Sequence, residues 1–144
     1  MAKILIVDDD SAVQSAIRLV LEPAGHTVFV AGDGRKGLSI LEAENFDLVL
    51  LDIFMPGMDG LETMRLIHQR RPVMPIIAIS GRPIASDAAS GPDFLAMATR
   101  LGAVARLQKP FKPAALLATI AGCLEAAKPP SSSSRWAGDR ASES

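Results

Sequence analysis

The segment FDLVLLDIFMPGMDG, residues 46–60, decides the fold because it contains a predicted buried strand that ends in an ionisable residue. Residues 46–51 are mostly apolar, which is typical of a strand that is covered on both faces. The run ends at Asp52, and a Met-Pro-Gly turn follows. Since a lone carboxylate is costly to bury, we expect Asp52 to have a partner, a metal ion or a chemical task.

Similar apolar runs alternate with helical patterns along the rest of the chain. Four further strands are predicted, at residues 3–7, 27–31, 75–80 and 103–108. Five helices are predicted, at residues 11–26 (closed by Pro23 and Gly25), 34–44, 61–70, 93–103 and 113–127. This alternation indicates an α/β fold in which helices cover both faces of a parallel sheet.

Length and composition limit the domain organisation. The chain has 144 residues, of which 49% are hydrophobic, enough for one domain with a sizeable core. We expect this domain to cover residues 1–127. Residues 128–144, KPPSSSSRWAGDRASES, are rich in serine and lack periodicity, so they are interpreted as a flexible tail.

Charge and cysteine content argue against several classes of function. The formal net charge of -1 gives no electrostatic case for binding nucleic acid or a membrane surface. The apolar runs are too short to cross a bilayer, and the N-terminal MAKILIVDDD does not resemble a signal peptide. The single cysteine, Cys123, excludes an internal disulfide and a multi-cysteine zinc site, and is interpreted as a small buried residue. A cytoplasmic protein is the simplest interpretation.

Polar side chains stand where the predicted strands end. Asp8–Asp10 follow the first strand, Asp52 ends the third, Ser80 ends the fourth and Lys109 follows the fifth. The carboxyl ends of parallel strands lie at the same edge of a sheet, where ligands bind near the topological switch point. We therefore expect one pocket that contains at least three carboxylates, a hydroxyl and an ammonium group.

This set of groups favours phosphoryl chemistry. Close carboxylates repel one another, and a hard divalent cation such as Mg²⁺ relieves that repulsion with oxygen ligands. The bound cation would attract a phosphoryl group, whose oxygens Lys109 and Ser80 could bind. Asp52 could then act as the nucleophile and form an aspartyl phosphate.

Four motifs, ILIVDDD, LLDIFMPGMDGLE, IIAIS and LQKPF, resemble the response-regulator receiver domain of bacterial two-component signalling. The resemblance covers roughly residues 3–126. It implies a flavodoxin-like (βα)5 fold, doubly wound, with a five-stranded parallel sheet in the order 2-1-3-4-5. It also implies a signalling switch that takes a phosphoryl group from a phosphohistidine, with Mg²⁺ as cofactor.

The resemblance assigns roles to individual residues. Asp52 would be the phosphoacceptor, and Ser80 and Lys109 would hold the phosphoryl oxygens. The Lys109–Pro110 peptide bond would be cis, which would aim the lysine into the pocket. The implied Mg²⁺ ligands are Asp9, Asp8 (mainly through water), Asp52 and the backbone carbonyl of Phe54.

Two features depart from the family pattern. Arg106 stands three positions before the lysine, where the family usually has an aromatic side chain that moves inward on phosphorylation. A guanidinium needs a partner in order to be buried, and Asp87 or Asp93 could supply one. The segment 81–93 is also longer than usual. We interpret this loop and the following helix as an output surface that becomes ordered on phosphorylation.

Smaller features have structural interpretations. Asp10 or Ser11 is expected to cap the first helix, and Asp59 the third. Trp136, in the tail, could dock on a partner or have no role.

The predicted partners are a histidine kinase or histidine phosphotransfer protein and an unknown downstream protein. No DNA-binding or enzymatic domain follows the last predicted helix, so output is expected through protein contact or onward relay. We expect a monomer or a weak phosphorylation-dependent homodimer that catalyses only its own phosphorylation and dephosphorylation.

Two alternatives remain open. One is a receiver-like binding module that acts without phosphorylation. The other is a Mg²⁺-dependent phosphatase of the haloacid dehalogenase kind, although its motif needs a second acid where this sequence has Phe54. A flavin carrier of similar fold is disfavoured, because three aspartates after the first strand would repel the FMN phosphate.

Overall fold

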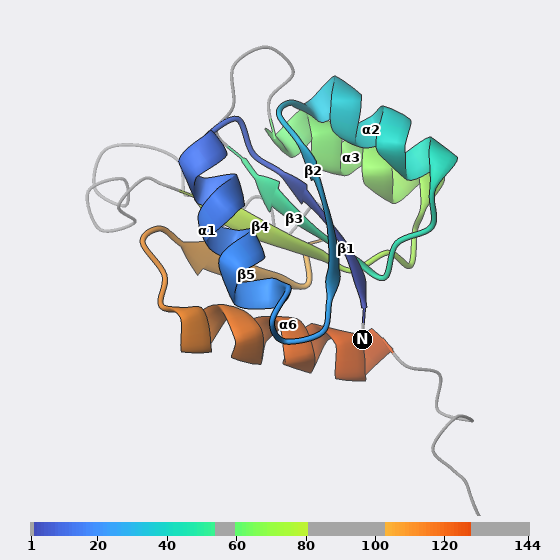
Figure 1. The fold of residues 1–144 in the computed structure, drawn as a ribbon. Coiled ribbons are helices and arrows are strands. Elements are labelled where there is room, and N and C mark those ends of the chain that lie inside the picture. The colour runs from blue at the N-terminus through green and yellow to red at the C-terminus, as the bar shows by residue number, and fades with distance from the viewer. Residues whose placement is uncertain (1, 54–59, 81–102, 128–144) are drawn as a thin grey trace, which may run out of the picture.

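The computed structural model describes residues 2–53, 60–80 and 103–127. Its strands are β1 (Lys3–Val7), β2 (Thr27–Ala31), β3 (Leu48–Asp52), β4 (Ile76–Ser80) and β5 (Ala105–Gln108) (Figure 1). Its helices are α1 (Ser11–Leu21), α2 (Gly34–Ala43), α3 (Gly60–Arg70) and α6 (Pro113–Ala127). The predictions for the loop 81–93, most of the helix 93–103, the tail 128–144, Phe54 and Asp59 fall outside the described residues.

The five strands form one parallel sheet in the order β2-β1-β3-β4-β5, which confirms the predicted fold class. The register aligns the carboxyl ends of the central strands. Val7 lies opposite Leu51 in β3, and Asp52 lies opposite Ile79 in β4. Ser80 lies opposite Gln108 in β5, so the residues that follow these strands share one edge of the sheet.

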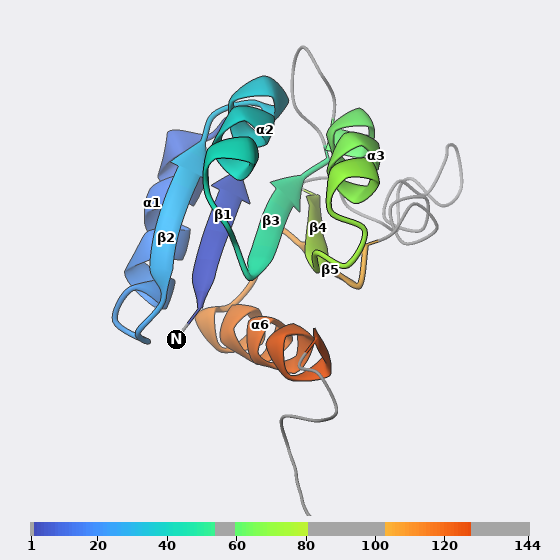
Figure 2. The ribbon, with the colours of Figure 1, turned by 90° about the vertical axis from the view of Figure 1, so that its right-hand side faces the viewer.

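Alternate side chains along the central strands point to opposite faces of the sheet and pack into two separate hydrophobic cores. Leu5, Val7, Val49 and Leu51 pack on one face against α2 and α3. Ile4, Ile6, Leu48 and Leu50 pack on the other face against α1 and α6. The two pairs of helices are visible on opposite faces in Figure 2. Because both faces are covered, the strands are apolar throughout, as their sequences predicted. None of the helices described here is long and apolar enough to span a bilayer.

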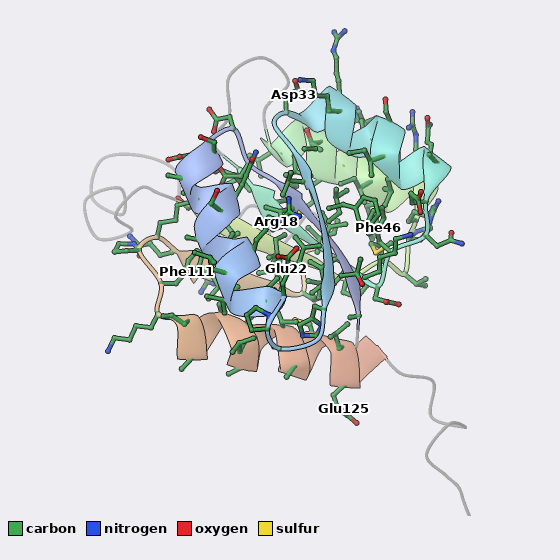
Figure 3. All side chains as sticks on the ribbon, viewed as in Figure 1. Arg18, Glu22, Asp33, Phe46, Phe111 and Glu125 are labelled. Atoms are coloured by element: carbon green, nitrogen blue, oxygen red, sulfur yellow. The ribbon has the colours of Figure 1, made fainter. Side chains whose placement is uncertain are left out.

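Local side chains fix where the helices and strands begin. The Asp10 carboxylate accepts hydrogen bonds from the amides of Ala12 and Val13, at 2.9 and 3.4 Å, which confirms Asp10 as the cap of α1. α1 ends at Leu21, before Pro23. On its outer side Arg18 Nη2 pairs with Glu22 Oε2 at 3.1 Å (Figure 3).

The amino end of β3 begins two residues later than predicted. Asp47 is outside the strand because its carboxylate accepts a hydrogen bond of 2.8 Å from the Lys3 amide. Phe46, labelled in Figure 3, packs edge-on against Phe29 with ring centroids 5.3 Å apart. The Lys3 ammonium lies 5.0 and 5.3 Å from these two ring centroids, which is cation–π distance.

Gly60, the first residue of α3, lies against the backbone at the end of β3. A Cβ at Gly60 would lie 2.2 Å from Ile53 Cα and 2.3 Å from the carbonyl oxygen of Asp52. Any side chain would therefore push α3 away from the strand end that carries Asp52. The sequence motif places a glycine here for packing as well as for the turn.

We predict that Gly60→Ala lowers the free energy of unfolding by about 1–3 kcal/mol, the range for overpacking a tight contact. Urea denaturation measures this change. Gly122→Ala in α6 is the matched control, because no atom lies within 4 Å of a Cβ there. It should stabilise the helix by about 0.5–1 kcal/mol. Equal effects of the two substitutions would contradict the close approach at Gly60.

Candidate functional site

Three charged side chains meet at the carboxyl end of the sheet. The Lys109 ammonium lies 2.8 Å from Asp8 Oδ2 and 3.2 Å from Asp52 Oδ2. Asp8 is fully buried and Asp52 is 4% exposed, whereas the Lys109 side chain is 19% exposed. One ammonium therefore bridges two buried carboxylates, each of which would be costly to bury alone.

Asp8 is held by the backbone around it. Its amide donates to the Ala31 carbonyl at 3.0 Å, which extends the β1–β2 pairing by one residue. Its Oδ1 accepts a hydrogen bond of 2.9 Å from the Asp10 amide. Its carbonyl oxygen accepts one of 2.6 Å from the Gln14 side chain in α1. These bonds leave Oδ2 as the oxygen that meets Lys109.

Lys109 is held at the same edge through its own backbone. Its amide donates to the Ser80 carbonyl at 2.7 Å, which continues the pairing of β4 with β5. The Lys109–Pro110 peptide bond is cis, as the resemblance implied. Ser80 is 2% exposed and directly follows Ile79, the residue opposite Asp52. The register thus brings Ser80, Asp52 and Lys109 to adjacent strand ends.

Two opposing effects act on the pKa of Lys109. Burial of the ammonium is the largest single effect, and it lowers the pKa. The close contact of the ammonium with the Asp8 carboxylate and the negative charges of Asp52 and Asp8 raise the pKa, and together they outweigh burial. The net pKa of Lys109 is raised, so the side chain stays positively charged at neutral pH.

The carboxylates of Asp8, Asp9 and Asp52 form a group that fits a hard cation. Each offers one oxygen, and these oxygens lie within 4.8 Å of one another. Asp8 Oδ2 accepts no hydrogen bond of good geometry, although Lys109 lies within ion-pair distance. A buried carboxylate oxygen without a hydrogen bond is expensive unless a cation compensates it. An all-oxygen set with one exposed member, Asp9, suits Mg²⁺, which retains water ligands.

Two further residues were singled out from the sequence, Phe54 and Arg106. The Phe54 carbonyl lies outside the described residues. Arg106 lies in β5 opposite Ala78 and is exposed. Its suggested partners, Asp87 and Asp93, also lie outside the described residues.

Sequence reasoning missed two contributions to the site. Lys109 was assigned to phosphoryl oxygens alone, yet it pairs with both buried carboxylates. Gln14 was overlooked, although it supports Asp8 from the first turn of α1. The sequence could have pointed to Gln14, because it is a polar residue beside Val13 at the start of the apolar face of α1. In the structure both residues are half-buried.

We predict that Lys109→Met lowers the free energy of unfolding at pH 7 by about 3 kcal/mol, the low end of the range for breaking a buried ion pair. The two buried carboxylates lose their shared cation and repel each other. Lys112→Met, at an exposed lysine nearby, is the matched control and should change stability little. Equal stabilities of the two variants would contradict the bridging role of Lys109.

The pH dependence of this stabilisation follows from the raised pKa of Lys109. A raised pKa in the folded state contributes stability that is complete below the unfolded pKa, about 10.4 for lysine, and lost as pH rises through the folded pKa. The difference between wild type and Lys109→Met should therefore be constant from pH 7 to about 10 and shrink above that value. Urea unfolding at several pH values measures it, and a loss near pH 8 would mean that burial dominates.

Comparison with known proteins supports the family resemblance. Residues 4–121 match the family described as "Response regulator receiver domain". Response regulator MprA of Mycolicibacterium vanbaalenii is 35% identical over 127 residues, which cover 88% of this chain and 52% of the relative. MprA of Mycobacterium tuberculosis strain H37Ra is also 35% identical over 127 residues. The chain thus spans about half the length of the curated relatives it matches.

Solved structures agree with the sequence comparison. A CheY-like receiver domain protein from Methanospirillum hungatei is similar with a TM-score of 0.77 and 33% identity, covering 88% of this chain and 96% of that one. The receiver domain of NtrX from Brucella abortus has a TM-score of 0.74 and 31% identity, covering 85% of this chain and 98% of that one. With its four motifs at the ends of four strands of a 2-1-3-4-5 sheet, this chain belongs to the response regulator receiver domain family of two-component signalling.

Proposed function

We propose that Asp52 is the phosphoacceptor of this receiver domain and takes its phosphoryl group from a phosphohistidine. The donor would be a histidine kinase or a histidine phosphotransfer protein. One observation carries the proposal: the carboxylates of Asp8, Asp9 and Asp52 converge beside the Lys109 ammonium. A buried nucleophile, a cation-binding set and a fixed positive charge are the parts that phosphoryl transfer requires.

Mg²⁺ is the proposed cofactor, with Asp8, Asp9, Asp52 and the backbone carbonyl of Phe54 as its protein ligands. When bound, it would neutralise negative charge on the carboxylates and on the entering phosphoryl oxygens. Asp8 and Asp52 are already held in place, because they are buried at the ends of β1 and β3. Metal binding would therefore cost little further conformational entropy at these two side chains.

In the transfer step, one Asp52 carboxylate oxygen forms a bond to phosphorus as the phosphorus–nitrogen bond of the donor histidine breaks. The nitrogen keeps the electron pair of the broken bond. Asp52 ends a strand that is paired on both sides, so its oxygen is held in place for in-line attack.

Lys109 and Ser80 would bind the phosphoryl oxygens once the group is on Asp52. The Lys109 ammonium is already 3.2 Å from Asp52 Oδ2, so oxygens attached there come within its reach. Ser80 stands at the neighbouring strand end and carries a hydroxyl donor. Burial of Asp52 limits access of water to the acyl phosphate, which favours a signal that lasts beyond the transfer.

The remaining parts of the proposal concern the output. We expect no reaction on other substrates beyond the domain's own phosphorylation and dephosphorylation. The signal would pass through contact with a downstream protein, without nucleic acid or membrane, or through onward relay, from a cytoplasmic monomer or a weak phosphorylation-dependent homodimer. The segment 81–93 and the helix predicted after it are the proposed output surface.

The test is an intact mass after incubation with acetyl phosphate, with and without Mg²⁺. We predict that wild type gains one phosphoryl group only when Mg²⁺ is present, and that Asp52→Asn gains none. The amide cannot act as the nucleophile, yet it keeps the shape of the side chain.

Asp33→Asn is the matched control. Asp33 caps α2 through the Lys36 amide, and asparagine caps helices as well as aspartate does. This variant should be phosphorylated like wild type. Phosphorylation of Asp52→Asn, or of wild type without any divalent cation, would contradict the proposed site.

A further inference from the structure

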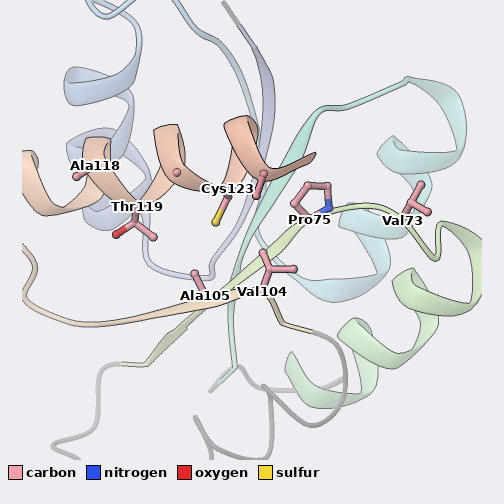
Figure 4. A pocket seen from close by; sticks show the side chains of 9 residues that line it. Val73, Pro75, Val104, Ala105, Ala118, Thr119 and Cys123 are labelled. Carbon is pink, nitrogen blue, oxygen red and sulfur yellow. The ribbon is translucent and has the colours of Figure 1, made fainter. Parts of the chain in front are cut away.

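An apolar groove lies between α6 and the residues that lead into β4 and β5, at the opposite end of the sheet from the carboxylates. Val73, Val104, Ala118, Gly122 and Cys123 are among its lining residues, and its volume is about 460 Å³ (Figure 4). Val104 directly precedes β5, so the groove lies at the amino end of that strand. Asp52 lies at the opposite, carboxyl end of the sheet.

The groove is apolar, and its lining side chains do not require a hydrogen-bond partner from an occupant. None of its lining residues carries a charge. Its one hydroxyl, on Thr119, already donates a hydrogen bond of 2.8 Å to the Ala115 carbonyl. Burial raises the pKa of the Cys123 thiol, which therefore remains protonated at neutral pH and behaves as an apolar group.

The groove exists because α6 carries small residues on this side. Ala118 and Gly122 are exposed, and a Cβ at Gly122 would meet no atom within 4 Å. Opposite them, Val104 is 59% exposed and Val73 is 91% exposed. Two valines at the rim of an uncharged hollow are typical of a surface that another apolar group covers.

The chain itself supplies a candidate for that group. Residues 128–144 begin two positions after Ala126, which lines the groove, and they contain Trp136, the only tryptophan in the sequence. Trp136 lies ten positions after Ala126, and an extended chain of that length reaches about 33–36 Å. The part of α6 from Ala118 to Ala126 is only about 12 Å long. Trp136 can therefore reach the whole length of the groove.

We propose that residues 128–144 fold back onto this groove and place the Trp136 indole between α6 and the residues before β5. The groove has the size of a typical small-molecule site, about 300–1,000 Å³, and an indole is a large, mostly apolar side chain. Covalent attachment makes the docking intramolecular, so a modest contact suffices. The docked segment would cover this side of α6, and a partner that binds there would first have to displace it. The proposal does not depend on phosphorylation of Asp52.

Fluorescence of the full chain tests the proposal, since the sequence has one tryptophan and no tyrosine. We expect the emission maximum of Trp136 to lie at a shorter wavelength than that of N-acetyltryptophanamide. Gly122→Glu should move the maximum to longer wavelength and raise the acrylamide quenching constant several-fold. A Cβ at Gly122 meets no atom within 4 Å, the carboxylate adds a charge to an uncharged groove, and glutamate is a better helix former than glycine.

Ala121→Glu is the matched control, because it adds the same side chain at an exposed position of α6 that does not line the groove. It should leave both readouts unchanged. A wild-type emission maximum equal to that of the free indole compound would overturn the proposal, as would equal effects of the two substitutions. A maximum that shifts with protein concentration would also overturn it, because a second copy would then be the occupant.

A reciprocal measurement uses Cys123, the only cysteine. If the indole covers the groove, alkylation of Cys123 by iodoacetamide should be several-fold faster in Trp136→Ala than in wild type. Trp136→Phe, which keeps an aromatic ring, should restore much of the protection. Equal rates in wild type and Trp136→Ala would contradict the docking.

Discussion

The structure depends on one ammonium group that lies between two buried carboxylates. Asp8 directly follows β1 and Asp52 ends the adjacent strand β3, and contact of Lys109 with both carboxylates offsets their mutual repulsion. The order of the sheet makes this contact possible: β3 beside β1 joins the two acids, and β5 beside β4 brings the lysine. Because the nearby Asp9 adds a further negative charge, the site keeps an excess that favours a divalent cation.

The same excess of charge bears on the proposed phosphorylation of Asp52. A phosphoryl group on Asp52 would attach new oxygens beside Lys109 and change which anions share its charge. The ammonium would then be drawn from its present contacts with Asp8 and Asp52 toward the phosphoryl group. The Lys109 amide donates a hydrogen bond to the Ser80 carbonyl, so a movement of Lys109 would also affect the ends of β4 and β5. The groove beside α6 stands apart from this chemistry, because it is uncharged and lies at the other end of β5.

The sequence predicted most of the described fold because strands covered on both faces are continuous apolar runs. β1 and β2 match their predicted bounds, and Asp52 ends β3 as expected. The start of β3 was wrong by two residues, because the side chain of Asp47, rather than a backbone carbonyl, accepts the hydrogen bond of the Lys3 amide. The polar residues that meet at the carboxyl edge of the sheet could be predicted to lie together, because strand ends are visible in the sequence; their roles stay a prediction. The double pairing of Lys109 and the contact of Gly60 with the β3 backbone could not be predicted, since both depend on distances between elements remote in sequence.

The most direct test of this account is to locate the phosphoryl group rather than to count it. Borohydride reduces an aspartyl phosphate to homoserine, and mass spectrometry of peptides from the phosphorylated, reduced chain identifies the converted residue. The account predicts conversion at Asp52 alone, beside the buried Asp8 and Lys109. Conversion at Asp8 or Asp9 instead would contradict it, because the nucleophile would then be a carboxylate that follows β1 and not the one that ends β3.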